Sequence, residues 1–144
     1  IAGFAHYDEI GGVGYKGSRY SAVVTYDGQW RRTGGWLIPE TVQKLMAPHA
    51  ASGGGIGPDG LLYLLGHDRP ELYVLAKPRL GPVLLHLATI EIAAEGQALA
   101  WDRTVPGRRL YAISRPNGVI RAFDIPEVQV THPDARRFPV PGAR

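Results

Sequence analysis

Short apolar runs separated by polar, glycine-rich segments make up most of this chain. In the clearest stretch, small residues lead into the tight-turn pair Asp59-Gly60, and apolar runs then alternate with polar loops. The predicted strands span residues 53–58, 61–65, 72–76 and 83–90. Four short strands within about 40 residues are typical of one β-propeller blade.

The following stretch repeats this pattern. A strand of small residues is followed by a turn at Pro106-Gly107, and a loop with an Asn117-Gly118 turn signal separates the next two strands. The predicted strands span residues 97–101, 110–114 and 119–125, with a fourth through 128–130. We expect residues 131–144, which contain three prolines, to form a loosely held C-terminal tail.

The first stretch is less regular. Residues 11–15 match an inner strand, residues 21–26 align with the third strands of the other repeats, and a long strand is expected at 29–38. This alignment leaves no room for a second strand, so the first repeat is either abridged or lacks residues that belong to it. Residues 39–46 are expected to form a short helical turn with Val42, Leu45 and Met46 inward.

The motif G-x-G-x-x-G occurs at residues 12–17 and again at 55–60, and a variant with alanines follows at 98–102. In a dinucleotide-binding fold this motif precedes a helix whose amides meet a pyrophosphate. Here β-branched and aromatic or short apolar runs follow both copies, which favours strands. The motif therefore sets the repeat, and no nucleotide cofactor is expected.

The second and third repeats resemble NHL-type repeats and the related propellers of the gluconolactonase and strictosidine-synthase-like group. The resemblance rests on G-I-G-P-D-G-L-L-Y-L-L-G-H-D-x-x-E-L-Y-V-L and on R-R-L-Y-A-I-S-R-P-N-G-V-I-R-A-F-D, and covers roughly residues 53–126. It implies an all-β fold with about three four-stranded blades of a larger ring, at residues 1–46, 47–91 and 92–130. Because such repeats cannot bury their faces alone, another copy or another part of the parent chain is expected to complete the ring.

Composition narrows the function classes. The 144 residues include no cysteine, which excludes disulfides, thiolate zinc sites and cysteine nucleophiles. The net charge of +3 is dispersed as short arginine pairs, so neither nucleic-acid nor membrane binding is expected. The sequence begins at Ile1 rather than Met, which indicates processing or a longer parent chain. We expect a secreted or periplasmic protein.

Two histidines occupy the same place in successive repeats. His6 and His49 each lie six residues before a G-x-G-x-x-G motif, and Glu95 lies near the corresponding place in the third repeat. Imidazole and carboxylate ligands suit divalent metals, so these three residues are a candidate metal set. The alternative is that both imidazoles hydrogen-bond backbone groups where two blades meet. In the resembled lactonase-like propellers, a metal is held near the axis by carboxylate and amide side chains, and some propeller lyases use histidines.

Further polar and aromatic residues are expected around one end of the channel and form a candidate ligand-binding rim. They are His67, Asp68, Arg69, Trp101, Arg115 and Asn117. Trp30 and Trp36, six residues apart, are expected on one face of a strand and are interpreted mainly as core packing. Two functions stay open: a binding or scaffold domain for a protein, sugar or small molecule, and a metal- or histidine-dependent hydrolase or lyase with its site on the propeller axis.

Overall fold

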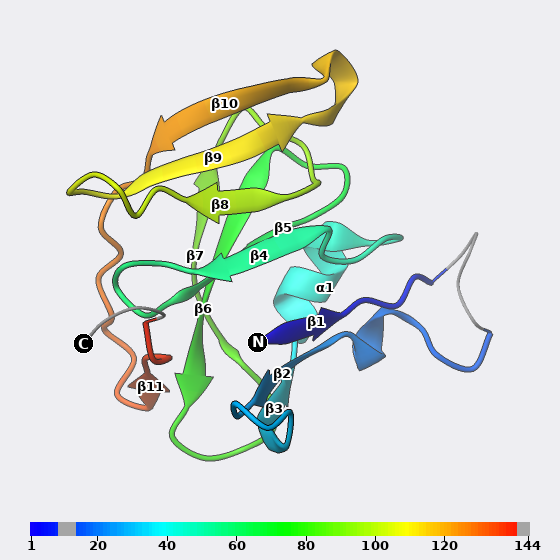
Figure 1. Ribbon diagram of the computed structural model, residues 1–144. Helices are drawn as coiled ribbons and strands as arrows, with labels where there is room; N and C mark the ends of the chain where they lie inside the picture. Colours follow the sequence, from blue (N-terminus) through cyan, green and yellow to red (C-terminus); the bar gives the residue numbers. More distant parts are fainter. Residues whose placement is uncertain (9–13, 141–144) are drawn as a thin grey trace.

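The computed structural model describes residues 1–8 and 14–140 (Figure 1). These residues form a mostly β structure of three antiparallel sheets, with one short α-helix, α1 (Glu40–Met46). The prediction of an all-β chain is confirmed at this level. α1 buries Val42 and Met46 against the core while Leu45 packs at its edge, as its apolar spacing predicts.

The central sheet is built from one continuous antiparallel meander. It contains β4 (Gly53–Ile56), β5 (Leu62–Leu65), β6 (Glu71–Pro78) and β7 (Leu85–Glu91). All four correspond to strands predicted from the sequence, and Asp59-Gly60 forms the predicted turn between β4 and β5, with Gly60 at a φ of +74°. The second G-x-G-x-x-G motif therefore lies in a strand and its hairpin turn, followed by another strand.

The two flanking sheets have three strands each. The N-terminal sheet contains β1 (Ala2–Phe4), β2 (Ala22–Tyr26) and β3 (Arg32–Leu37), in that order. The C-terminal sheet contains β8 (Leu99–Trp101), β9 (Arg109–Ser114) and β10 (Val119–Asp124). The turn after β9 includes a short 3₁₀-helix, η2 (Arg115–Asn117), and a second such helix, η1 (Ser18–Tyr20), precedes β2.

The N-terminal sheet differs from the predicted alignment. Residues 22–26 pair directly with β1, so they occupy the second position of the sheet rather than the third. The inner strand predicted at 11–15 lies partly outside the described residues, and residues 14 and 15 form a turn. Glycine spacing does not locate the first strand here, because Gly3 lies in the strand that pairs with β2.

The tryptophan prediction is also corrected. Trp30 lies in the turn between β2 and β3, with a φ of 61° and 81% of its surface exposed, so the strand is shorter than the predicted 29–38. Trp36 lies on β3 and packs edge-on against Phe138, with ring centroids 5.7 Å apart. The two side chains therefore do not share a strand face, and only Trp36 fills the core as interpreted.

The C-terminal residues differ from the sequence expectation at two places. Residues 128–130 form no strand, so the C-terminal sheet ends at β10. The segment after residue 131, expected to be loosely held, adds β11 (Ala135–Arg136) to the end of β6 and buries Phe138. The amide of Phe138 donates to the carbonyl of Gly60 at 2.7 Å, which fixes the segment beside the β4–β5 turn.

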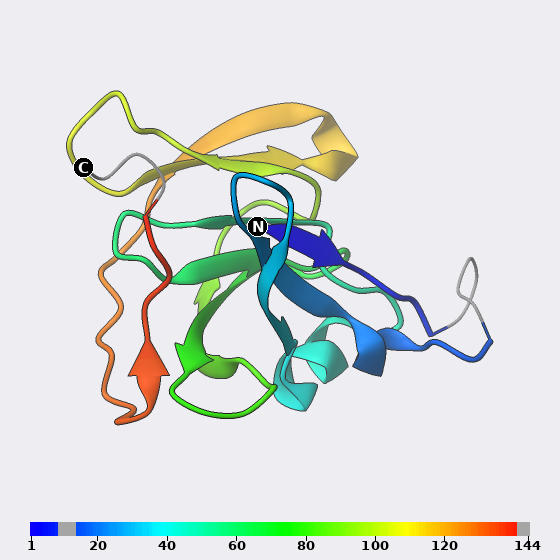
Figure 2. The same ribbon diagram turned by 60° about the horizontal axis from the view of Figure 1, so that its bottom comes forward.

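The three sheets stack face to face, with the central sheet between the other two (Figures 1 and 2). Alternate residues of β5, together with Leu61 just before it, serve the two interfaces: Leu62 and Leu64 pack toward the N-terminal sheet, and Leu61, Tyr63 and Leu65 pack toward the C-terminal sheet. The first strands of the central and C-terminal sheets approach closely. A Cβ atom at Gly53 would overlap the carbonyl oxygen of Gln97, so glycine is required there.

Candidate functional site

Connections from all three sheets bring polar side chains together at one end of the molecule. His49 lies between α1 and β4, and His67 and Asp68 lie in the β5–β6 loop. Arg115 begins η2 between β9 and β10, and Tyr7 follows β1. Antiparallel strands return their alternate connections to the same end of a sheet, and stacking the sheets aligns these ends. We call the resulting group of five residues the histidine cluster.

The local backbone holds the β5–β6 loop against its neighbours. A Cβ atom at Gly96 would overlap the carbonyl oxygen of Gly66 and crowd the Cα of His67, so the β7–β8 connection passes directly over the loop. Near the other histidine, Ala50 is buried and the amide of Asp8 donates to the carbonyl of Pro48 at 3.0 Å. These contacts fix both segments that carry the imidazoles.

Asp68 is the centre of the histidine cluster. Its Oδ2 lies 2.8 Å from Nδ1 of His49, and its Oδ1 lies 2.7 Å from Nδ1 of His67. Hydrogen bonds from His67 and then from His49 lower the pKa of the Asp68 carboxyl below its usual value, since both favour the carboxylate. The carboxylate therefore orients both imidazoles.

Stacking and a guanidinium complete the arrangement. The rings of His49 and His67 stack with centroids 4.0 Å apart, and the ring of Tyr7 meets His49 edge-on at 5.2 Å. Nη1 of Arg115 lies 2.7 Å from Nε2 of His67, and its Nη2 lies 3.7 Å from Oδ1 of Asp68. The same Nη1 lies 3.2 Å from Nδ1 of His67, so the guanidinium lies beside both ring nitrogens.

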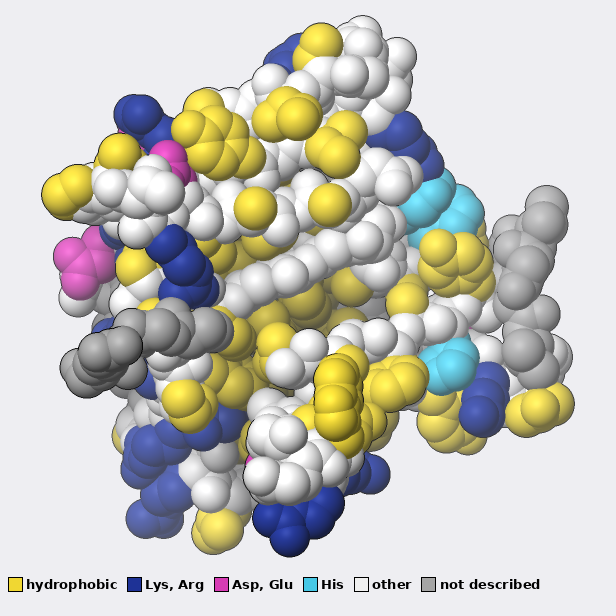
Figure 3. Space-filling model, in the orientation of Figure 1, with side chains coloured by type: hydrophobic (Ala, Val, Ile, Leu, Met, Phe, Trp, Pro, Cys, Tyr) yellow, Lys and Arg dark blue, Asp and Glu magenta, His cyan; other side chains and the backbone are white. Residues whose placement is uncertain are grey.

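The cluster is accessible to solutes. The side chains of His49, Asp68 and Arg115 are 32%, 44% and 38% exposed, respectively. Figure 3 shows histidine side chains on the surface at the side of the molecule where the β1 segment and the loops of the central sheet end. The arrangement offers hydrogen-bond donors, a carboxylate and imidazole nitrogens to a ligand, and it can hold a proton between imidazole and carboxylate.

The structure brings together three of the six residues predicted for the rim, namely His67, Asp68 and Arg115. The other three lie in different surroundings. Arg69 is 3.8 Å from the carboxylate of Glu71, the amide of Asn117 reaches Ser114, and Trp101 lies at the opposite end of β8 beside Tyr63.

The predicted metal set is not brought together. Among the described residues, one group of His and Asp side chains has ligand atoms within 4.8 Å of one another, and it consists of His49, His67 and Asp68. The backbone amide of His6 donates to Ser21 Oγ at 3.0 Å, and Glu95 accepts from the Ser114 hydroxyl at 3.2 Å. His49 is thus the one shared member, because its neighbours come from the β5–β6 loop rather than from equivalent repeat positions.

Sequence reasoning missed Tyr7 altogether. This residue follows His6 in the segment after β1, and its counterpart in the next repeat is Ala50, so the repeat carried no signal for it. Its position beside His49 depends on the pairing of β1 with β2, which the sequence alignment placed elsewhere.

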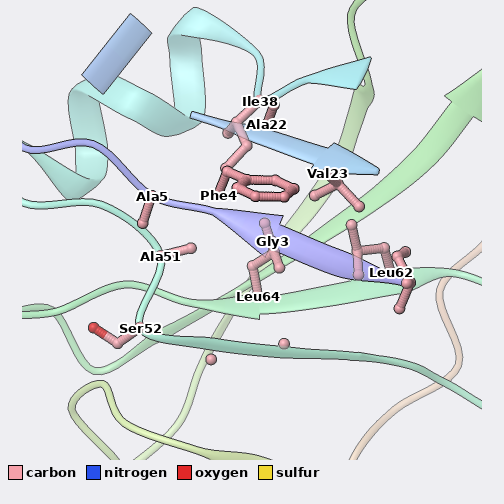
Figure 4. Close-up of a pocket in the computed structure, with 13 residues that line it drawn as sticks. Gly3, Phe4, Ala5, Ala22, Val23, Ile38, Ala51, Ser52, Leu62 and Leu64 are labelled. Carbon is pink, nitrogen blue, oxygen red and sulfur yellow. The ribbon is translucent and has the colours of Figure 1, made fainter. Parts of the chain in front are cut away.

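A separate cavity of about 230 Å³ opens between β1 and the first two strands of the central sheet (Figure 4). Phe4, Val23 and Ile38 line one side, and Leu62 and Leu64 line the other. Ser52 supplies the one polar side chain among the lining residues. This cavity is apolar and lacks the donors and acceptors that the histidine cluster provides.

Comparison with protein-family models, with curated proteins and with solved structures finds no match to this chain. In the described part of the chain, no helix has the length and apolar character needed to span a bilayer.

Proposed function

We propose that this chain is part of a propeller-type repeat domain that binds a small polar ligand at the histidine cluster. The fold supports this through three antiparallel sheets stacked face to face, each contributing a connection to the same end. In a propeller, the sheets lie around an axis and ligands bind at one end of it. A second copy, or another part of the parent chain, would complete the ring.

The observation that carries the binding proposal is the convergence of His49, His67, Asp68 and Arg115 from three separate connections. A structural ion pair needs only two partners, whereas this group surrounds one carboxylate with three donors and remains partly exposed. A guanidinium and two imidazoles suit a ligand that combines a carboxylate with hydroxyl groups, such as a sugar acid. The ring of Tyr7 adds an apolar surface beside them.

The binding proposal is tested by titrating the isotope-labelled chain, kept in chelator, with glucuronate, glucose and lactate, and following its amide NMR signals. Glucuronate is expected to shift the signals of residues 66–70 and 115–118, and Arg115→Ala to abolish the shifts. Arg69→Ala is the matched control, because Arg69 lies in the same loop but pairs with Glu71. The proposal fails if these signals stay unchanged with every probe.

A histidine-dependent hydrolase or lyase is the second candidate. It is favoured by the 2.8 Å contact between Asp68 and Nδ1 of His49, because a carboxylate in this position orients an imidazole as a general base. The same titration distinguishes the two functions when a lactone is added as a further probe. A hydrolase converts the lactone to its hydroxy acid, whereas a binding domain leaves it unchanged.

A further inference from the structure

We infer that His49, His67 and Asp68 form the protein part of a site for a divalent transition metal of the zinc class. This inference rests on the proposed binding site and assigns it a chemical partner. Two imidazole nitrogens and one carboxylate oxygen are a ligand set that Zn²⁺ and related ions accept, with a position left open for water or a bound molecule.

The spacing of the ligand atoms carries the inference. Bonds of about 2.0–2.1 Å in tetrahedral geometry place neighbouring ligand atoms about 3.3 Å apart. The contacts of Asp68 with the two Nδ1 atoms measure 2.7 and 2.8 Å, and all three residues offer ligand atoms within 4.8 Å of one another. Small side-chain rotations therefore suffice to place these atoms around one ion.

The backbone has already positioned these ligands. Asp68 and His67 are neighbours in a loop held by the close approach of Gly66 and Gly96, and His49 is fixed by the buried Ala50 beside it. The stacked rings keep the two imidazoles side by side at 4.0 Å. Little conformational freedom is then lost when an ion binds, because the same contacts order the side chains without it.

Arg115 weakens metal binding at this site. Its Nη1 lies 2.7 Å from Nε2 and 3.2 Å from Nδ1 of His67. A cation bound at Nδ1 of His67 would therefore lie close to the guanidinium of Arg115. Its positive charge repels the cation. Replacing Arg115 should therefore strengthen metal binding, whereas the same change weakens binding of an anionic ligand.

The experiment titrates the chelator-treated chain with Co²⁺ and Zn²⁺, following the visible absorption of Co²⁺ and the heat of Zn²⁺ binding. One ion per chain is expected, with affinity reduced at least tenfold in His49→Ala, His67→Ala and Asp68→Asn. Arg115→Gln should tighten binding at least threefold. His86→Ala is the control, because His86 lies on β7 and its imidazole hydrogen-bonds with the carbonyl of Ala88 and the hydroxyl of Thr89. Circular dichroism of each variant shows whether it remains folded.

The inference is overturned if neither the unchanged chain nor Arg115→Gln takes up an ion, or if His86→Ala weakens binding as much as the ligand variants do. This outcome is distinct from failure of the proposed function. The glucuronate titration is done in chelator and measures organic-ligand binding without metal, whereas the metal titration contains no organic ligand.

Discussion

Tyr63 illustrates how single residues hold the end of the sheets opposite the histidine cluster. Its hydroxyl donates to Asp59 Oδ2 at 2.7 Å, and Arg108 contacts the same carboxylate at 2.9 Å. Burial, and then the hydrogen bond to Asp59, raises the pKa of Tyr63 well above its usual value, so the phenol stays protonated and donates. The guanidinium also lies over the rings of Tyr63 and Trp101. This group links the central sheet to the C-terminal sheet.

At the residue scale we predict that Tyr63→Phe destabilises the chain by about 1–2 kcal/mol, because the Asp59 carboxylate and the Arg108 guanidinium, which donates to the Tyr63 hydroxyl at 2.5 Å, each lose a hydrogen-bond partner. Tyr111→Phe is the matched control. Its hydroxyl contacts Asp102 at 3.3 Å on the surface, so its loss should change stability by less than about 0.5 kcal/mol. Urea unfolding followed by fluorescence measures both. Equal losses in the two variants would contradict the assigned role of this group.

The sequence predicted individual residues of the candidate site only where they lie in loops that can be recognised from the sequence. Polar composition and turn signals placed His67, Asp68 and Arg115 in loops, and the structure brings these three together. The partnership of His49 with Asp68 could not be predicted, because it depends on how two connections 19 residues apart fold over each other. His6 was misleading, since an equal repeat position does not give an equal side-chain environment.

At the element scale, the C-terminal segment is attached to the central sheet by strand pairing and by one buried side chain. β11 pairs with the end of β6, and Phe138 is only 4% exposed. The ring of Phe138 meets Trp36 of β3 edge-on, while Nζ of Lys77 lies 5.3 Å from its centroid. A single aromatic side chain thus joins the segment to two sheets.

We therefore predict that Phe138→Ala destabilises the chain by about 3 kcal/mol, through lost burial and the cavity that remains. Leu80→Ala is the control, because Leu80 is 82% exposed in the β6–β7 turn and its truncation should cost less than about 0.5 kcal/mol. Thermal unfolding by calorimetry compares the two variants. If Phe138→Ala has the same melting temperature as the unchanged chain, the segment is the loose tail that its prolines suggest.

Strands were predicted correctly where local sequence signals agreed. They were predicted wrongly where strand formation depends on pairing with a distant segment. In the central sheet, Asp59-Gly60 and the apolar runs at 61–65 and 72–76 all favoured the same hairpins, and the strands are found there. Residues 128–130 have strand-forming valines but no strand partner, and β1 has little sequence signal but a partner in β2. Pairing between distant segments is a tertiary property that short-range patterns do not contain.

At the scale of the whole molecule, the two faces of the C-terminal sheet differ in their surroundings. One face packs on the central sheet through Leu110 and Ala112. The opposite face carries Tyr111 and Ile120, which are 38% and 72% exposed, on neighbouring strands where Tyr111 lies across from Ala122. By contrast, the central sheet has both of its faces covered. Apart from the Arg109–Asp124 ion pair at one end, the uncovered face has the apolar character of a surface that packs against another sheet.

We predict that the 144-residue chain alone self-associates through this face, because a second copy can cover it when no other part of a parent chain is present. Ile120→Lys places a charge in the middle of the contact and should shift the chain toward monomer by at least tenfold in dissociation constant. Leu80→Lys adds the same charge at a similarly exposed site in the β6–β7 turn and should leave association unchanged. Sedimentation velocity over a range of concentrations measures the mass of each species. A stable monomer at every concentration would show that the face needs no partner, and the proposal that these sheets belong to a larger ring would fall with it.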